Sequence, residues 1–281
     1  MAKKSWKQRL ISLVLTMIML FTSLLTGMPD TVQAAAARLS EISRGTDITS
    51  LPGSSFNPVE DQLITFKFNK SAGYKMLNIS GKMLPWIKNG NTVAGAQFQS
   101  MEDLNGKTPG VIYYHVAKDE TTGYYYNLRV DITGWKKSAY TWKDPNGNRV
   151  PPFIGIATRK IGFYMLGLDY IDCKFTYLID DGSSEDGRPM TSEEKKNFFS
   201  YITLCDLDAT QAFTINQQPG LKGVYKVKGT DNIYQSGDLI VSQDRWSGGD
   251  NSDSTPAGWV TAYMEGTDNL VISFHDEQKY A

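Results

Sequence analysis

The chain has 281 residues, with 29 Lys and Arg against 30 Asp and Glu, which gives a formal net charge of −1. This balance does not supply the basic stripe that a nucleic-acid-binding surface needs. The two histidines, His115 and His275, are too few for the usual zinc sites and make a His-based catalytic triad a poor explanation. Hydrophobic residues make up 41% of the chain and aromatic residues 12%, which is enough for a buried core.

The N-terminal end has the order of a secretory signal peptide. Lysines and an arginine open the chain, an apolar run covers Leu10–Leu25, and a stretch of small residues follows. We expect a signal peptide over residues 1–36, cleaved near Ala34 or Ala36. An uncleaved anchor is the alternative, because the apolar run is close to the ~20 residues that a membrane span needs. Pro29 and the alanines favour cleavage, so we expect a secreted, extracellular protein that meets the membrane only during export.

A polar segment and then a series of strand patterns follow. Residues 37–58 are rich in Gly, Pro and Ser and are expected to form a flexible linker, and residues 59–281 to form one β-sandwich domain. Apolar and polar residues alternate in many short runs after this linker, which is typical of half-buried strands. We expect strands at Leu63–Phe68, Gly110–Val116, Tyr124–Trp135, Ile171–Tyr177, Tyr201–Leu207, Gly223–Val227, Asp238–Val241, Trp259–Met264 and Asn269–Phe274.

The segments between these runs predict turns and at most one short helix. Asp180–Ser184 and similar Asp-, Gly- and Ser-rich segments have the composition of turns. Thr191 and Glu194 have the spacing of a capping box, which marks the start of a helix. Many short strands separated by turns predict an all-β fold, a β-sandwich or a jelly roll.

The middle of the chain resembles a known family. The strand-hairpin pattern of Gly110–Trp135, followed by the runs "IGFYMLGLDYIDCKFTY" and "YITLCDLDATQ", is similar to the N-terminal β-rich domain of Gram-positive surface adhesins and fimbrial proteins. The Lys-rich start also resembles the export signals of Gram-positive bacteria. The resemblance extends over roughly Leu63–Phe274 and implies a secreted or cell-surface binding domain without enzymatic activity. Asn127 stands where the resemblance implies an acidic residue.

Four aromatic residues are candidates for a ligand-binding surface, because exposed aromatic rings stack on sugars and pack against protein partners. The alternation of residues 124–135 also allows some of these rings to pack in the core, and both interpretations stay open. The candidates are Tyr124 and Tyr126 in the predicted strand and Trp142 and Trp246 in predicted loops.

The two cysteines and a pair of aspartates are candidates for covalent and metal chemistry. Cys173 and Cys205 can form a disulfide in an oxidising compartment or remain as buried thiols that act as small apolar residues. Asp206 and Asp208 lie one pleat apart, so both carboxylates point to one face of a strand end. They can bind Ca²⁺ through oxygen ligands, act as a glycosidase pair, or simply cap the strand end.

These observations give one leading hypothesis and one alternative. The leading hypothesis is a non-enzymatic domain of adhesin or fimbrial type that binds an extracellular protein or glycan and needs no cofactor. The alternative is a carbohydrate-binding jelly-roll module, supported by calcium. No catalytic residue is assigned, because the chain carries neither a nucleophile elbow nor an HExxH motif.

Overall fold

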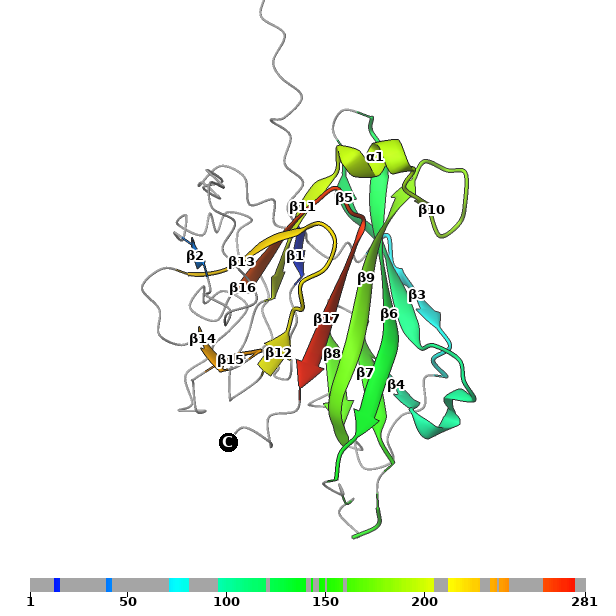
Figure 1. The fold of residues 1–281 in the computed structure, drawn as a ribbon. Coiled ribbons are helices and arrows are strands. Elements are labelled where there is room, and N and C mark those ends of the chain that lie inside the picture. The colour runs from blue at the N-terminus through cyan, green and yellow to red at the C-terminus, as the bar shows by residue number, and fades with distance from the viewer. Residues whose placement is uncertain are drawn as a thin grey trace, which may run out of the picture.

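The computed structural model describes three sheets of mainly antiparallel strands that pack into a β-sandwich (Figure 1). It describes residues 13–15, 39–41, 71–80, 96–119, 122–139, 143, 147–149, 151–158, 161–204, 212–227, 233–236, 238–242 and 260–275. The sandwich confirms the predicted all-β fold class. No helix in this described part of the chain has the length and apolar character needed to cross a membrane.

A nine-stranded sheet, here called the large sheet, forms the centre of the molecule. Its strand order is β14-β15-β12-β17-β9-β6-β5-β3, and β10 pairs with the end of β9. Its strands are β3 (Tyr74–Leu77), β5 (Gly110–Lys118), β6 (Tyr125–Lys137), β9 (Leu168–Asp180), β10 (Arg188–Pro189), β12 (Ala212–Thr214), β14 (Ile233–Ser236), β15 (Leu239–Ser242) and β17 (Asn269–His275).

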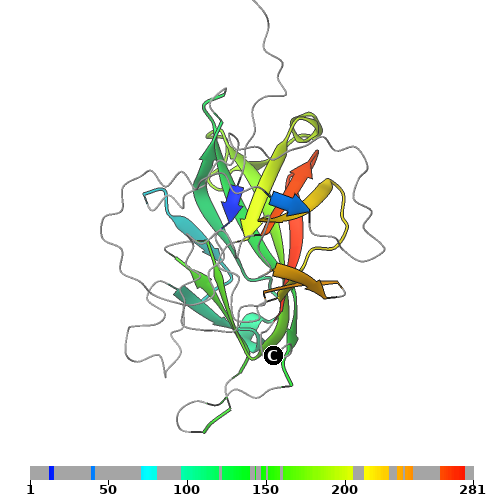
Figure 2. The same cartoon turned by 90° about the vertical axis from the view of Figure 1, so that its left-hand side faces the viewer.

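Two smaller sheets cover one face of the large sheet. The five-stranded sheet has the order β1-β11-β16-β13-β2 and the three-stranded sheet the order β4-β7-β8. Their strands are β1 (Leu13–Leu15), β2 (Leu39–Glu41), β4 (Ala96–Ser100), β7 (Phe153–Ala157), β8 (Phe163–Leu166), β11 (Phe199–Leu204), β13 (Leu221–Val227) and β16 (Val260–Glu265). Figure 2 shows the five-stranded sheet in front of the long strands of the large sheet. A single buried cluster includes residues of all three sheets, so they share one core.

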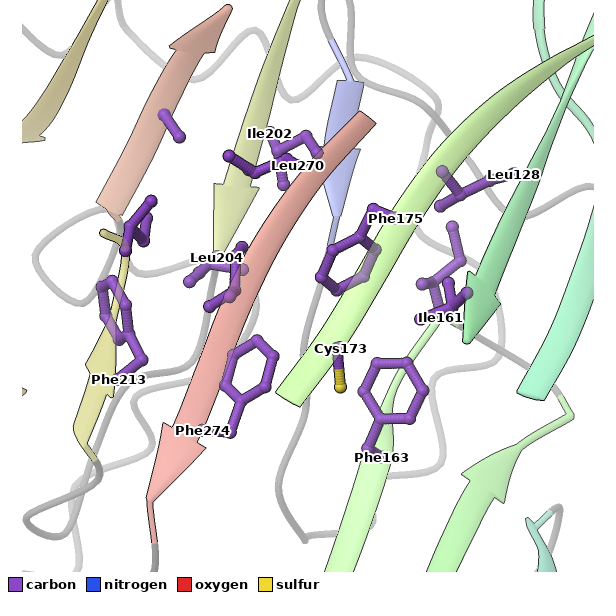
Figure 3. Close-up of a cluster of buried hydrophobic side chains, with 14 of the residues drawn as sticks. Leu128, Ile161, Phe163, Cys173, Phe175, Ile202, Leu204, Phe213, Leu270 and Phe274 are labelled. Carbon is purple, nitrogen blue, oxygen red and sulfur yellow. The ribbon is translucent and has the colours of Figure 1, made fainter. Parts of the chain in front are cut away.

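The alternation of the long strands explains which face of the large sheet is buried. In β9, Ile171, Cys173 and Phe175 are fully buried, while the residues between them are half-buried on the other face. Figure 3 shows Cys173 and Phe175 among core side chains from neighbouring strands, including Phe163 and Phe274. Burial of each large apolar side chain contributes about 1.5–3 kcal/mol, so this face decides the register of the strands. On the opposite, outer face of β9 the residues Asp172, Lys174 and Thr176 are polar.

The predicted elements are confirmed where the structure describes them. Strands occupy the described parts of the runs expected from residue 110 to residue 274, while Leu63–Phe68 lies outside the described residues. The short helix α1 (Ser192–Lys196) begins with the predicted capping box, in which Thr191 and Glu194 each bind the other's backbone N–H. The alternation pattern missed β7, because all five of its residues are buried and it does not alternate.

Candidate functional site

The candidate residues from the sequence do not all fall in the described part of the chain. Trp142, Trp246, Cys205, Asp206 and Asp208 lie outside the described residues. Their predicted roles in ligand, disulfide and calcium binding therefore stay predictions.

Of the tyrosines at the start of β6, some lie on the surface and one lies in the core. Tyr124 precedes the strand and is 44% exposed, in keeping with a ligand contact. Tyr126 is only 9% exposed and packs on Phe198, and burial raises the pKa of its hydroxyl to about 12. The expectation that Tyr126 lies on a binding surface is therefore wrong, because it occupies the inward phase of the strand. Tyr125, between these two residues, is 36% exposed.

Tyr125 belongs to a group on the outer face that we call the His115 patch: His115, Lys118, Tyr125 and Asp180. The cross-strand register places Lys118, Tyr125 and Asp180 opposite one another on β5, β6 and β9. The His115 ring stacks on the Tyr125 ring at a centroid distance of 4.1 Å, and its Nε2 lies 2.9 Å from the Asp180 carboxylate. The Lys118 ammonium lies 5.9 Å from the centroid of the same tyrosine ring, within range of a cation–π interaction.

A β-bulge aims His115 at this patch. The pairing of β5 with β6 is irregular between Tyr113 and Ala117, and His115 there has a φ of 51°. This left-handed conformation is uncommon for a residue other than glycine and has to be held by the surrounding structure. Bulges of this kind redirect a side chain out of the regular pleat.

Asn127 holds the bulge in place. This side chain is fully buried, and its Oδ1 accepts the His115 backbone N–H at 2.8 Å. Its Nδ2 donates to the carbonyl oxygen of Asp186 at 3.2 Å. An acidic residue, which the family resemblance implies here, has no amide donor for that carbonyl. The structure thus gives a physical reason for the asparagine.

The loop of residues 181–187, between β9 and β10, closes over the outer face beside the patch. The Asp186 carboxylate accepts hydrogen bonds from Lys75 Nζ at 2.9 Å and from the Tyr114 hydroxyl at 3.0 Å. The bond from Lys75 holds the pKa of Asp186 below its ordinary value. Burial, together with the bond to Asp186, raises the pKa of Tyr114 to about 12. Both groups therefore keep their charge states near neutral pH, and the loop stays bound to β3 and β5.

The far end of the loop is bound to α1 by an arginine. Arg188 donates to Asp181 at 2.6 Å and to both carboxylate oxygens of Glu194, at 2.8 and 2.9 Å. The Arg188 bonds lower the pKa of Glu194 to about 2. Hydrogen bonds from Ser183 and then Arg188 lower that of Asp181 to about 2 as well. The patch therefore rests on a frame that is fixed at both ends.

The His115 patch combines an imidazole, a carboxylate, an ammonium and an aromatic ring. Among the described residues, the hydrogen-bond partner of the His115 ring is Asp180, with no hydroxyl or thiol nucleophile at hydrogen-bonding distance. Within the same residues, no group of three or more His, Cys, Asp and Glu side chains is placed to hold a metal ion. The patch instead offers exposed aromatic surface beside a cation, a carboxylate and an imidazole.

Cys173, one half of the predicted disulfide, lies far inside the sandwich. Its side chain is fully buried as a free thiol, and burial raises its pKa well above the ordinary value. Its predicted partner Cys205 lies outside the described residues, so the pairing stays a prediction.

The sequence did not single out His115, Lys118 or Asp180 for this site. The bulge and the loop depend on contacts between positions that lie far apart in the chain. The one local signal was the Asn127 anomaly, which falls on the residue that holds the bulge.

Comparison with solved structures gives a distant likeness. No protein-family model matches the chain, and no curated protein matches it. Among solved structures, the chain is similar to the N-terminal domain of the Streptococcus gordonii adhesin Sgo0707, with a TM-score of 0.38 and 10% sequence identity. The match covers 75% of this chain and 57% of that one, so this chain spans little more than half of that structure.

Proposed function

We propose that this chain is a secreted or cell-surface binding domain of a Gram-positive bacterium, of adhesin or fimbrial type and without enzymatic activity. Its partner is an extracellular protein or glycan, and the His115 patch supplies the main contact. The observation that carries the proposal is the exposed Tyr125 ring, which stacks on His115 on a fixed frame of sheet and loop and is preceded in the chain by the exposed Tyr124.

Three features support this function. Exposed tyrosines supply large contact areas at low cost in conformational entropy, and interface hot spots are enriched in tyrosine. The strained bulge and the bound loop fix the Tyr125 ring, through His115, before a ligand arrives, which reduces the entropy lost on binding. The N-terminal pattern of residues 1–36 supports an extracellular setting.

The test compares the wild type with a double variant, Tyr124→Ser and Tyr125→Ser. Binding is measured by surface plasmon resonance on immobilised extracellular-matrix proteins and on a glycan array. Loss of an anchoring aromatic costs about 1–3 kcal/mol, so we expect affinity to fall at least about tenfold. Tyr234→Ser is the matched control, because Tyr234 is 42% exposed on β14 at the other edge of the large sheet. Equal binding by all three proteins would contradict the proposal.

The same array separates the calcium-supported alternative. Binding that EDTA abolishes, and that the double variant Asp206→Ala and Asp208→Ala also loses, would favour the carbohydrate-binding jelly-roll module. We expect binding to survive both treatments. Trp142 and Trp246 are proposed as further aromatic contacts, so their replacement by alanine should weaken binding.

A further inference from the structure

We propose that the outer face of the large sheet carries a second binding site, which takes the hydroxyl groups of an uncharged sugar. The site, here called the His275 patch, consists of Tyr170, Asp172, Thr214, Ser273 and His275. It lies at the other end of β9 from the His115 patch and does not depend on the function proposed for that patch.

The strand register gathers these side chains from three neighbouring strands. Thr214, Ser273 and Asp172 are cross-strand partners on β12, β17 and β9. His275 and Tyr170 form the next outward-facing pair on β17 and β9. Residues two apart along a strand share a face, so both rows point to the outer face. All five side chains are half-buried, and therefore fixed yet reachable from solvent.

A glycine gives the Asp172 carboxylate its position. Gly134 lies opposite Asp172 at a β-bulge of β6, and a Cβ at Gly134 would collide with Asp172 Oδ2. The Asp172 carboxylate thus occupies the space that the Cβ of any residue other than glycine at position 134 would fill. The Ser273 hydroxyl donates to the other oxygen, Oδ1. Asp172 Oδ2 keeps lone pairs for a ligand hydroxyl, and the Ser273 oxygen can accept a second one.

The imidazole of His275 lies beside the hydrogen-bonded pair of Asp172 and Ser273 and is held by Thr214. Its Nε2 lies 2.9 Å from the Thr214 hydroxyl, and its ring centroid lies 6.0 Å from that of Tyr170. A carboxylate acceptor, two hydroxyls and two rings therefore lie within two rows of one sheet. This mixture of donors, acceptors and aromatic surface matches a sugar, which presents adjacent hydroxyls beside apolar C–H groups.

The charge of the surroundings favours a neutral ligand. Lys136, which lies opposite Tyr170, forms an ion pair with Asp169 at 2.9 Å. With Asp172, and with Lys174 two residues further along the same face of β9, the charged side chains around the patch are two carboxylates and two ammoniums. The patch therefore has no excess of positive charge to attract a phosphate or an acidic sugar, and an uncharged sugar needs none.

The two patches are far enough apart to be separate sites. Tyr170 and Asp180 stand at opposite ends of β9, and a strand rises about 3.3 Å per residue, so they lie roughly 33 Å apart. The chain holds two histidines, one in each patch. The imidazole NMR signals of the untagged protein therefore report the two sites independently.

The experiment titrates the protein with methyl α-mannoside, methyl β-galactoside and N-acetylglucosamine while both histidine signals are followed. We expect at least one sugar to shift the His275 signal saturably, with a dissociation constant on the order of millimolar for such a shallow site, and to leave His115 unchanged. Gly134→Ala displaces the carboxylate without removing it and should weaken binding about tenfold, the effect of one lost hydrogen bond to a charged group. Ser273→Ala should weaken it as well.

Asp131→Asn is the matched control, because Asp131 is an outer-face carboxylate of β6 that pairs with Arg129. It should leave sugar binding unchanged. Asp172→Asn serves as a second variant if Gly134→Ala fails to fold. The proposal is overturned if none of the three sugars shifts His275 saturably. It is also overturned if a folded Gly134→Ala or Asp172→Asn protein binds like the wild type, or if inorganic phosphate shifts the signal as strongly as the sugars. The Tyr124 and Tyr125 double variant should keep sugar binding here, so failure of one proposal does not imply failure of the other.

Discussion

Replacement of Asn127 by aspartate tests how the His115 patch is held together. The two side chains have nearly the same shape, so the change removes only the amide donor and adds a carboxylate. The retained oxygen can still accept the His115 N–H. The other oxygen then faces the carbonyl of Asp186, at a site where the side chain is fully buried.

The expected loss of stability follows from these contacts. The lost hydrogen bond to Asp186 costs about 1 kcal/mol. A buried carboxylate with one N–H partner and an opposing carbonyl adds a further penalty of roughly 2 kcal/mol, so we expect a total of about 3 kcal/mol at neutral pH. Burial raises the folded-state pKa of the introduced carboxyl above its ordinary value of about 4. The penalty is therefore smallest below that ordinary value and grows as the pH rises through the folded-state pKa.

Urea unfolding of the wild type and of Asn127→Asp at pH 4 and pH 7 measures this difference. Asn197→Asp is the matched control, because Asn197 also donates its amide to a backbone carbonyl but is exposed. We expect a small loss in the control and a large, pH-dependent loss in Asn127→Asp. The His115 NMR signal should move as well, because the bulge loses its support. A variant as stable as the wild type at pH 7, with an unchanged His115 signal, would refute the reasoning.

Three further predictions concern the frame, the thiol and the leader. Because the folded-state pKa of Glu194 is lowered from 4.5 to about 2, the Arg188 pair stabilises the fold above pH ~4.5 and loses this effect as the pH falls toward 2. In Arg188→Gln, the free energy of unfolding should change less between pH ~2 and pH ~4.5 than in the wild type. In Lys196→Gln, its pH dependence should equal that of the wild type. For the cysteines, a disulfide would leave the peptides of Cys173 and Cys205 linked in non-reducing peptide maps. Alkylation of both cysteines in the denatured protein without reductant would contradict the disulfide. Intact-mass measurement of the extracellular protein should show a chain that begins near the expected cleavage site, and a full-length species in the membrane fraction would contradict secretion.

Features that depend on residues close together in the sequence were predicted correctly. The α1 capping box joins residues three positions apart, and its geometry is the one the spacing predicted. The alternation of residues 171–177 in β9 predicts which of them are buried, because side chains on a strand project to opposite faces in turn. For Tyr126 the same alternation left a core face and a ligand face open, and only the structure places the side chain in the core.

The amino-acid sequence by itself determined the all-β class, the phase of the long strands and the position of α1, since each depends on neighbours within a few residues. Tertiary structure alone decided where the candidate sites lie. The His115 patch needs contacts between residues 12 and 65 positions apart, and its loop needs one over 111 positions. The His275 patch likewise joins β9 to β17 across 101 positions. Local pattern cannot specify such pairs, because strand order and register arise only when the sheets pack around a common core.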